Sequence, residues 1–204
     1  MAVVSQPFSC TASVPELRDI DEDNGEFWVG NPFMFSNVKE NLSAYERNGC
    51  FLNDQNGSFL DMSYLSGSDN RGDSRTVVSA DIDNDGMPEL FVRQVGGGAL
   101  VVYKNNFPQT NWLTISLRGD KSNSAGIGAK VIVTAGDLTV HRELYPVVNF
   151  LSQAPANVHV GLQNHSQVDS VKILWPSGEV TLLKDVKANQ HLRVFEADGH
   201  TEAL

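Results

Sequence analysis

The stretch DIDNDGMPE, residues 81–89, carries acidic side chains at its first, third, fifth and ninth positions and a glycine at its sixth. Short apolar runs flank it on both sides, VVSA at residues 77–80 and LFV at residues 90–92. Short runs rich in β-branched and aromatic residues favour strands over helices. The stretch therefore predicts an acidic loop that joins two β-strands.

The acidic spacing in this loop predicts a metal site. Alternate carboxylates converge on one point if the chain curls around it, and Gly86 permits the backbone angles of that curl. Calcium is bound by about 6–8 oxygen ligands. Four carboxylates within nine residues repel one another unless a cation lies among them, although a solvated acidic turn is the alternative interpretation. The predicted ligands of a structural Ca²⁺ are Asp81, Asp83, Asp85, the main-chain carbonyl of Met87, and Glu89.

The same loop resembles the start of an EF-hand loop, but two features argue against that motif. Its twelfth position is Val92, where an EF-hand has a bidentate Glu. Pro88 and the flanking apolar runs favour strands, whereas an EF-hand loop lies between helices. A calcium site between two strands remains the prediction.

Five short apolar strands are predicted in the region around the loop. They cover residues 50–53, 58–62, 76–80, 90–93 and 99–103. This density of strands describes a β-meander close to one blade of a propeller. A full propeller needs roughly 4–8 blades, and the sequence contains one complete unit of this kind, so a full propeller does not fit.

The second half of the sequence has strands at the spacing of a β-sandwich or small barrel. Seven are predicted, at residues 112–117, 129–135, 140–145, 157–161, 168–175, 180–183 and 191–195. The predicted fold is therefore all-β, with a single propeller-blade-like calcium-binding β-meander packed against a C-terminal β-sandwich. The predicted parts are an irregular N-terminal segment with an aromatic cluster and a short helix near its end (1–48), the calcium-binding unit (49–106), the β-domain (107–197) and a tail (198–204).

Composition excludes several classes of protein. The net charge is −10, and residues 1–104 hold 16 acidic against 7 basic side chains, so the clustered positive charge of a nucleic-acid-binding protein is absent. The acidic excess indicates cation binding or plain solubility. No apolar run is long enough for a transmembrane helix, and the first residues lack the pattern of a signal peptide. Cys10 and Cys50 are compatible with a disulfide or with two free thiols.

The sequence resembles two known families in succession. The sequence motifs VSADIDNDG at residues 78–86 and ELFV at residues 89–92 resemble the FG-GAP/VCBS-type repeat. Residues 109–197 resemble the ASPIC/UnbV domain, and the combination is similar to the C-terminal part of cartilage acidic protein relatives, including bacterial secreted members. The sequence motifs that carry the second resemblance are SN at 122–123, GIGA at 126–129, LSQ at 151–153, HVGL at 159–162, VD at 168–169 and WPSG at 175–178.

The resemblance implies a calcium-bound blade followed by a β-domain in an extracytoplasmic protein, which is secreted, on the cell surface or periplasmic. Because the first residues lack a signal-peptide pattern, the signal peptide of such an exported protein is expected to be absent from this sequence. One departure is Glu89, where the repeat normally has the shorter Asp. The expected function is binding or adhesion without catalysis, with a cell-surface or matrix protein or a glycan as partner. The alternative is an enzyme or accessory subunit that acts on a carbohydrate or secondary metabolite. A buried carboxylate pair in a deep cleft favours the enzyme, and a calcium site far from any pocket favours the binding module.

Four further signals have a structural and a functional interpretation. The RGD tripeptide at residues 71–73 is expected to be inert in adhesion. His159 lies between apolar strand positions and is expected in the core. Trp175 is expected to plug the core, the alternative being an exposed ring that stacks on a sugar. Glu143 and Asp169 are a weak candidate for an acid–base pair.

Overall fold

The computed structural model describes residues 47–204, apart from residues 55, 71, 73, 95–98, 148 and 151. Within these residues the regular structure consists of strands and includes no helix, which confirms the all-β prediction. Accordingly, no described helix is long and apolar enough to cross a membrane. A short helix was predicted at residues 38–47, and its residues 38–46 lie outside the described residues, as do the aromatic cluster, Cys10, Arg71 and Asp73. Arg47, its last residue, is not helical.

Contacts along the chain divide it into two units. The first consists of residues 1–77 and 91–103, and the second of Val78–Leu90 and Lys104–Leu204. The acidic loop at residues 81–89 therefore belongs, by its contacts, to the same unit as the C-terminal β-domain.

The five strands predicted around the loop are present, but they form two sheets instead of one meander. They are β1 (Phe51–Asn53), β2 (Phe59–Asp61), β3 (Ser74–Ala80), β4 (Glu89–Gln94) and β5 (Val101–Tyr103). β1 and β2 pair as an antiparallel hairpin, whereas the other three form a sheet in the order β3-β4-β5. Asp54 closes the β1–β2 turn, because its Oδ1 accepts hydrogen bonds from the main-chain N–H groups of Asn56 and Ser58.

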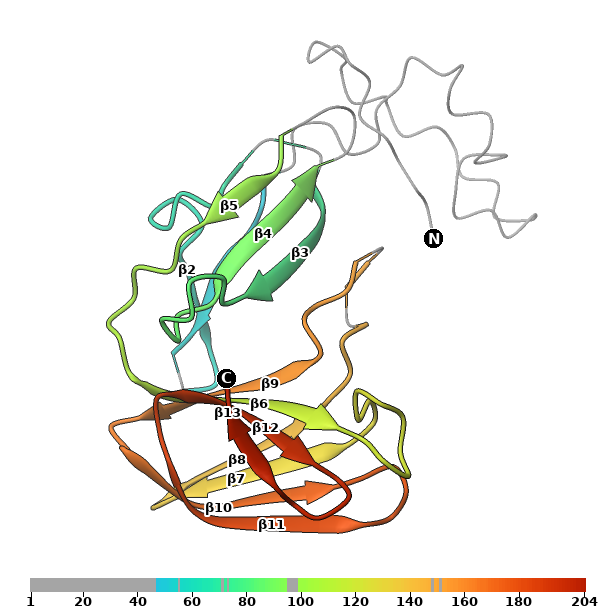
Figure 1. Ribbon diagram of the computed structural model, residues 1–204. Coiled ribbons are helices and arrows are strands. Elements are labelled where there is room, and N and C mark those ends of the chain that lie inside the picture. The colour runs from blue at the N-terminus through green and yellow to red at the C-terminus, as the bar shows by residue number, and fades with distance from the viewer. Residues whose placement is uncertain are drawn as a thin grey trace, which may run out of the picture. The chain divides into compact units, whose positions relative to one another are not determined.

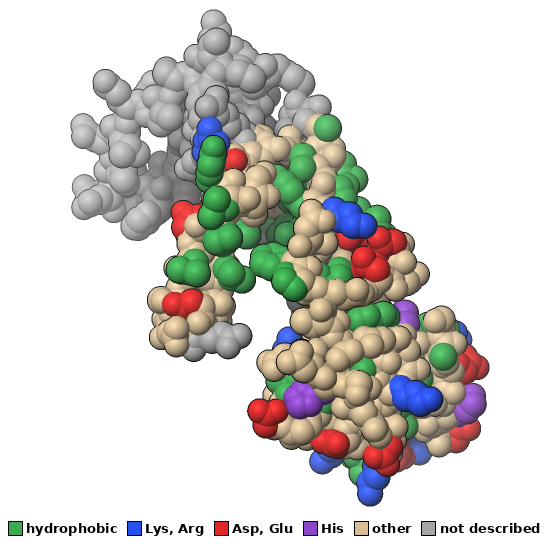
Figure 2. Space-filling model, turned by 90° about the vertical axis from the view of Figure 1, so that its left-hand side faces the viewer, with side chains coloured by type: hydrophobic (Ala, Val, Ile, Leu, Met, Phe, Trp, Pro, Cys, Tyr) green, Lys and Arg blue, Asp and Glu red, His purple; other side chains and the backbone are tan. Residues whose placement is uncertain are grey.

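The first unit leaves much apolar surface exposed. Its only buried apolar side chain among the described residues is Val92. Figure 2 shows hydrophobic side chains gathered on the surface of this unit, and those of the β1–β2 hairpin are exposed: Phe51, Leu52, Phe59 and Leu60. The larger core of the described residues therefore lies in the second unit.

The second unit contains two four-stranded sheets. Its strands are β6 (Asn111–Arg118), β7 (Lys130–Ala135), β8 (Leu138–Glu143), β9 (Asn157–Gln163), β10 (Gln167–Leu174), β11 (Val180–Lys187), β12 (Gln190–Phe195) and β13 (Thr201–Ala203). One sheet has the order β11-β10-β7-β8 and the other β13-β12-β6-β9. β6 and β12 pair in parallel, and the other pairs are antiparallel. β13 was not predicted, because its sequence TEA has no apolar alternation to distinguish it from a tail.

One hydrophobic core lies between these two sheets, which face each other in Figure 1. Side chains alternate along a strand, so β6 directs Leu113, Ile115 and Leu117 into the core and leaves Trp112, Thr114 and Ser116 on the outer face. Trp175 is 3% exposed and belongs to the core, where its indole N–H donates to Thr181 Oγ1 at 2.8 Å. The prediction that Trp175 plugs the core is confirmed.

Candidate metal centre

The acidic loop connects the end of β3 to the start of β4. β3 ends at Ala80 and β4 begins at Glu89, so Asp81 and Glu89 lie at the two ends of the loop. Asn84 (φ 58°) and Gly86 (φ 83°) adopt left-handed backbone angles, which reverse the chain within these few residues. The loop is curled in the way the sequence predicted.

Main-chain N–H groups hold the first aspartate of the loop in place. Asp81 Oδ1 accepts a hydrogen bond from the N–H of Asp85 at 3.2 Å, and Asp81 Oδ2 accepts one from the N–H of Gly86 at 2.9 Å. Asp85 Oδ1 accepts from the N–H of Met87 at 2.7 Å. These bonds fold the loop back over the carboxylate of Asp81.

Three of the predicted ligands converge on one point. Asp81, Asp83 and Glu89 each place a carboxylate oxygen within 4.8 Å of the others. Asp85 is not part of this group, and its Oδ1 is bonded to the Met87 N–H. A role for Asp85 and for the Met87 carbonyl as ligands stays a prediction.

Glu89 provides a second, independent indication of a cation. It is only 3% exposed, and its Oε2 accepts a long hydrogen bond of 3.4 Å from the N–H of Ile82. Its Oε1 is buried and has no hydrogen-bond partner. A buried carboxylate oxygen without a partner is costly unless a cation satisfies it. The three-carboxylate group therefore fits a hard cation such as Ca²⁺, whose preferred ligands are oxygens.

A lysine lies beside the group. Lys104 Nζ is 3.1 Å from Asp83 Oδ2, and both side chains are about half exposed. The hydrogen bond from Lys104 lowers the pKa of Asp83, and the same bond raises the pKa of Lys104, with a smaller contribution from the charge of Glu89. Lys104 thus competes with any cation for Asp83.

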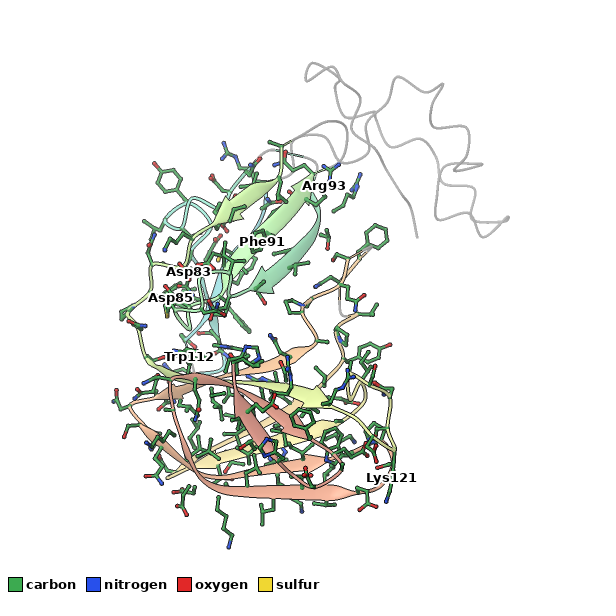
Figure 3. The ribbon with its side chains drawn as sticks, viewed as in Figure 1. Asp83, Asp85, Phe91, Arg93, Trp112 and Lys121 are labelled. Carbon is green, nitrogen blue, oxygen red and sulfur yellow. The ribbon has the colours of Figure 1, made fainter. Side chains whose placement is uncertain are left out.

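The loop packs against the first buried residue of β6. A Cβ atom on Gly86 would lie 2.0 Å from Trp112 Nε1, so only glycine fits between the loop and this ring. Gln109 Nε2 donates to the carbonyl of Asp85 at 2.9 Å, and Asn105 Nδ2 donates to the carbonyl of Pro88 at 3.4 Å. Figure 3 shows Asp83 and Asp85 near the Trp112 end of the β-domain, with Lys121 at its other end.

Sequence reasoning missed Trp112, which it treated as the start of a strand. The relevant signal was present: a large ring begins a strand soon after the loop, at a position that alternates outward from Leu113. The sequence could not show that Gly86 lies opposite that ring, because Gly86 and Trp112 are 26 residues apart in the chain.

A cavity of about 520 Å³ borders the loop within the second unit. The outer face of β6, β9 and β12 forms one side of it, the loop forms another, and the segments after β8 and before β9 complete it. It is lined by Ser79, Ala80, Asp81, Asn84, Pro88, Trp112, Thr114, Arg142, Glu143, Leu144, Tyr145, Pro146, Ala154, Pro155, Asn157, His159 and His191.

Two other sequence candidates are found away from their expected surroundings. His159 was expected in the core, but it lies on the outer face of β9, partly buried, between the core residues Val158 and Val160. Glu143 pairs with Lys130 at the start of β7, whereas Asp169 Oδ2 accepts a hydrogen bond from the N–H of Gly136 beyond the end of that strand. The structure does not bring Glu143 and Asp169 together as an acid–base pair.

We expect Lys104→Met to increase the calcium affinity of the loop by about two- to fivefold, because the substitution removes a competing positive charge at the surface. Isothermal titration with CaCl₂ at low ionic strength measures the change. Lys121→Met is the matched control, since Lys121 forms a similarly exposed ion pair with Glu179 at 2.6 Å. An unchanged affinity in Lys104→Met would show that the cation does not share Asp83 with this lysine.

Comparison with protein families matches two parts of the chain. Residues 38–92 match the model of an FG-GAP-like repeat, and residues 119–201 match the model described as ASPIC and UnbV. The first match contains the acidic loop, and the second covers β7 to β12 and reaches the start of β13. No curated protein matches the chain.

Proposed function

Because the chain carries an FG-GAP-like repeat followed by an ASPIC and UnbV domain, we propose that it is a calcium-binding extracytoplasmic module with a binding or adhesion function. The calcium is structural, and its ligands include Asp81, Asp83 and Glu89. The observation that carries this proposal is the buried, partnerless Oε1 of Glu89 in the three-carboxylate group.

The loop explains what a bound calcium would do for the fold. Asp81 and Glu89 lie at opposite ends of the loop, so a cation between them joins the ends of β3 and β4. The loop in turn packs against Trp112 through Gly86. The ion therefore supports the position of the loop on β6, with Asp85 and the Met87 carbonyl as candidates for its remaining oxygen ligands.

The chemistry of the site supports an extracytoplasmic location. Calcium sites of extracellular modules work at about 10⁻⁴–10⁻³ M, because calcium outside the cell is abundant. A half-exposed aspartate shared with a lysine is suited to this range better than to the tighter sites of cytosolic buffers. FG-GAP and UnbV domains occur in extracellular and surface proteins, and the proposed partner is a cell-surface or matrix protein or a glycan.

We expect saturating calcium to raise the melting temperature by about 5–10 °C relative to chelator, since a ligand at 100 times its Kd stabilises the folded state by about 2.7 kcal/mol. Differential scanning calorimetry of the full chain in CaCl₂ and in EGTA measures the shift. Asp83→Ala and Glu89→Gln should each abolish it. Asp137→Asn is the control, because the Asp137 side chain is 97% exposed in the β7–β8 turn.

Equal melting temperatures with and without chelator would overturn the proposal, provided that elemental analysis finds no calcium retained after dialysis. A shift that survives Glu89→Gln would place the ion elsewhere. In that case the unpaired Oε1 of Glu89 would need another partner.

A second candidate function is an enzyme or accessory subunit that acts on a carbohydrate or secondary metabolite. The observation that favours it is the position of Asp81, which belongs both to the three-carboxylate group and to the lining of the cavity. An enzyme of this kind is also expected to have a buried pair of carboxylates in the cavity. The second acid of the lining, Glu143, is exposed on β8 and forms no buried pair with Asp81, which favours binding. Product analysis by mass spectrometry after incubation with a bound glycan distinguishes turnover from binding.

A further inference from the structure

The cavity beside the loop is lined by both hydrogen-bond donors and hydrogen-bond acceptors. Its lining includes a carboxylate on Asp81, amides on Asn84 and Asn157, a hydroxyl on Thr114 and a guanidinium on Arg142. These groups come from the loop, from β6, β8 and β9, and so converge from different sides. At about 520 Å³ the cavity is within the roughly 300–1,000 Å³ typical of small-ligand sites.

Two imidazoles on the floor of the cavity are held by neighbours on β6. Thr114 Oγ1 lies 2.9 Å from His159 Nδ1, and Ser116 Oγ lies 2.6 Å from His191 Nε2. The ring of His159 also stacks on Trp112, with centroids 6.0 Å apart and planes 21° from parallel. Both histidines are thus positioned before any ligand arrives, which reduces the entropy cost of binding.

Burial favours the uncharged form of both imidazoles. It lowers the pKa of His159, against the opposing charge of Asp81, and it lowers the pKa of His191, helped by Arg193. A neutral imidazole has one N–H donor and one nitrogen acceptor. Such a pair suits a ligand whose groups both donate and accept.

The remaining surface suits a ligand with both hydroxyl groups and apolar C–H faces. Ring surfaces come from Trp112, Tyr145 and three prolines, and such rings pack against C–H groups. The formal charges of the lining, Asp81 and Glu143 against Arg142, do not concentrate positive charge in the way an anion site does. A neutral sugar combines the hydroxyl groups, the C–H face and the lack of charge that this lining requires.

We propose that this cavity binds a saccharide, the terminal one or two sugar units of a neutral glycan, and that the cation in the loop maintains the cavity. The second part rests on the calcium site proposed above. Asp81 and Asn84 line the cavity from the loop, so a loop that loses its cation and shifts off Trp112 alters the binding surface. The glycan would thus bind next to the cation site, in contact with side chains of β6, β9 and β12.

A glycan array tests the proposal with the full chain, labelled at its N-terminus and applied to neutral and acidic glycans from animal, plant and bacterial sources in CaCl₂ and in EGTA. We expect binding to a group of neutral glycans with a shared terminal sugar, and a loss of at least tenfold in EGTA. Calorimetric titration with the matching methyl glycoside then gives the affinity of each variant. Arg142→Ala and Asn157→Ala should each weaken it at least fivefold, whereas Lys172→Ala, an exposed change on β10 in the other sheet, should leave it unchanged.

Each outcome separates this inference from the calcium proposal. If calcium raises the melting temperature but no glycan binds in CaCl₂, the saccharide site is wrong and the calcium site stands. If a neutral glycan binds equally in EGTA, and calcium does not shift the melting temperature, the saccharide site stands and the cation is wrong. Binding confined to acidic glycans also overturns the saccharide proposal. So does an affinity that neither Arg142→Ala nor Asn157→Ala changes, when calorimetry shows that these variants and the Lys172→Ala control are folded.

Discussion

Gly86→Ala should destabilise the protein and weaken calcium binding together. Gly86 has a φ of 83°, and a Cβ atom there would lie 2.0–2.4 Å from atoms of the Trp112 indole ring. The substitution therefore adds backbone strain of about 1–3 kcal/mol and an overpacking cost of about 1–3 kcal/mol. We expect the melting temperature to fall by about 10 °C and the calcium affinity to fall at least tenfold, because the loop must move off β6. Calorimetry and calcium titration of the same preparation measure both changes.

Gly178→Ala is the matched control for this experiment. Gly178 has a φ of 92° in the turn after Trp175, but a Cβ atom there would meet nothing within 4 Å. It should therefore show the strain cost alone, about 1–3 kcal/mol, with unchanged calcium affinity. If the two variants lost the same stability, the contact between the loop and Trp112 would be refuted.

Glu196→Gln should lower the melting temperature at neutral pH and remove much of the acid sensitivity. Glu196 is 8% exposed, and its carboxylate accepts four hydrogen bonds. The donors are the N–H groups of Asp120 (2.6 Å) and Ser122 (2.8 Å) and the hydroxyls of Ser122 (2.7 Å) and Ser177 (2.6 Å). The carboxylate thus joins β12 to the segment after β6 and to the turn after β10. An amide replaces one acceptor oxygen by a donor, which leaves buried donors unsatisfied.

The pH dependence follows from the pKa of the same group. Burial alone would raise the pKa of Glu196, but the hydrogen bonds from Ser177, Ser122 and Asp120 outweigh burial and lower it to about 2, from an ordinary value of 4.5. A lowered pKa means that the stabilisation is complete above about pH 4.5 and is lost as the pH falls toward 2. The melting temperatures of the parent chain and Glu196→Gln should therefore differ most at pH 6–7 and converge toward pH 2.

Glu202→Gln provides the comparison for this series, since Glu202 forms a half-exposed ion pair with Arg193 at 3.7 Å. Its melting curve should follow that of the parent chain at every pH, because such surface pairs contribute little. A Glu196→Gln curve that stayed parallel to the parent between pH 7 and pH 2 would contradict the assigned pKa.

The positions of the strands and of the acidic loop could be predicted from the sequence because their signals are local. The five strands around the loop lie within two residues of their predicted bounds, since apolar alternation and turn residues act over a few neighbours. The all-β class and the two family resemblances likewise rest on short sequence motifs. The seven later strands are also present, although β11 continues to Lys187, four residues beyond its predicted end.

The arrangement of the strands into sheets could not be predicted in the same way. β1 and β2 form a sheet of their own, and β6 pairs in parallel with β12, more than seventy residues later in the chain. Such pairing depends on how apolar faces are covered in three dimensions, and many registers satisfy the same alternation. The short strand β13 depends on pairing with β12, because its own sequence carries no strand pattern.

The sequence by itself determined that this protein is all-β and has an acidic loop between two strands, because spacing within nine residues already limits which carboxylates can converge. The tertiary structure decided which of them do: Asp81, Asp83 and Glu89, with one oxygen of Glu89 buried and unpaired. It also placed Trp112 against Gly86 and directed His159 and His191 into one cavity beside the loop. Trp112, His159 and His191 come from β6, β9 and β12, which are far apart in the chain and are brought together by their pairing in one sheet. The loop reaches them by packing of Gly86 against Trp112, which no strand pairing dictates.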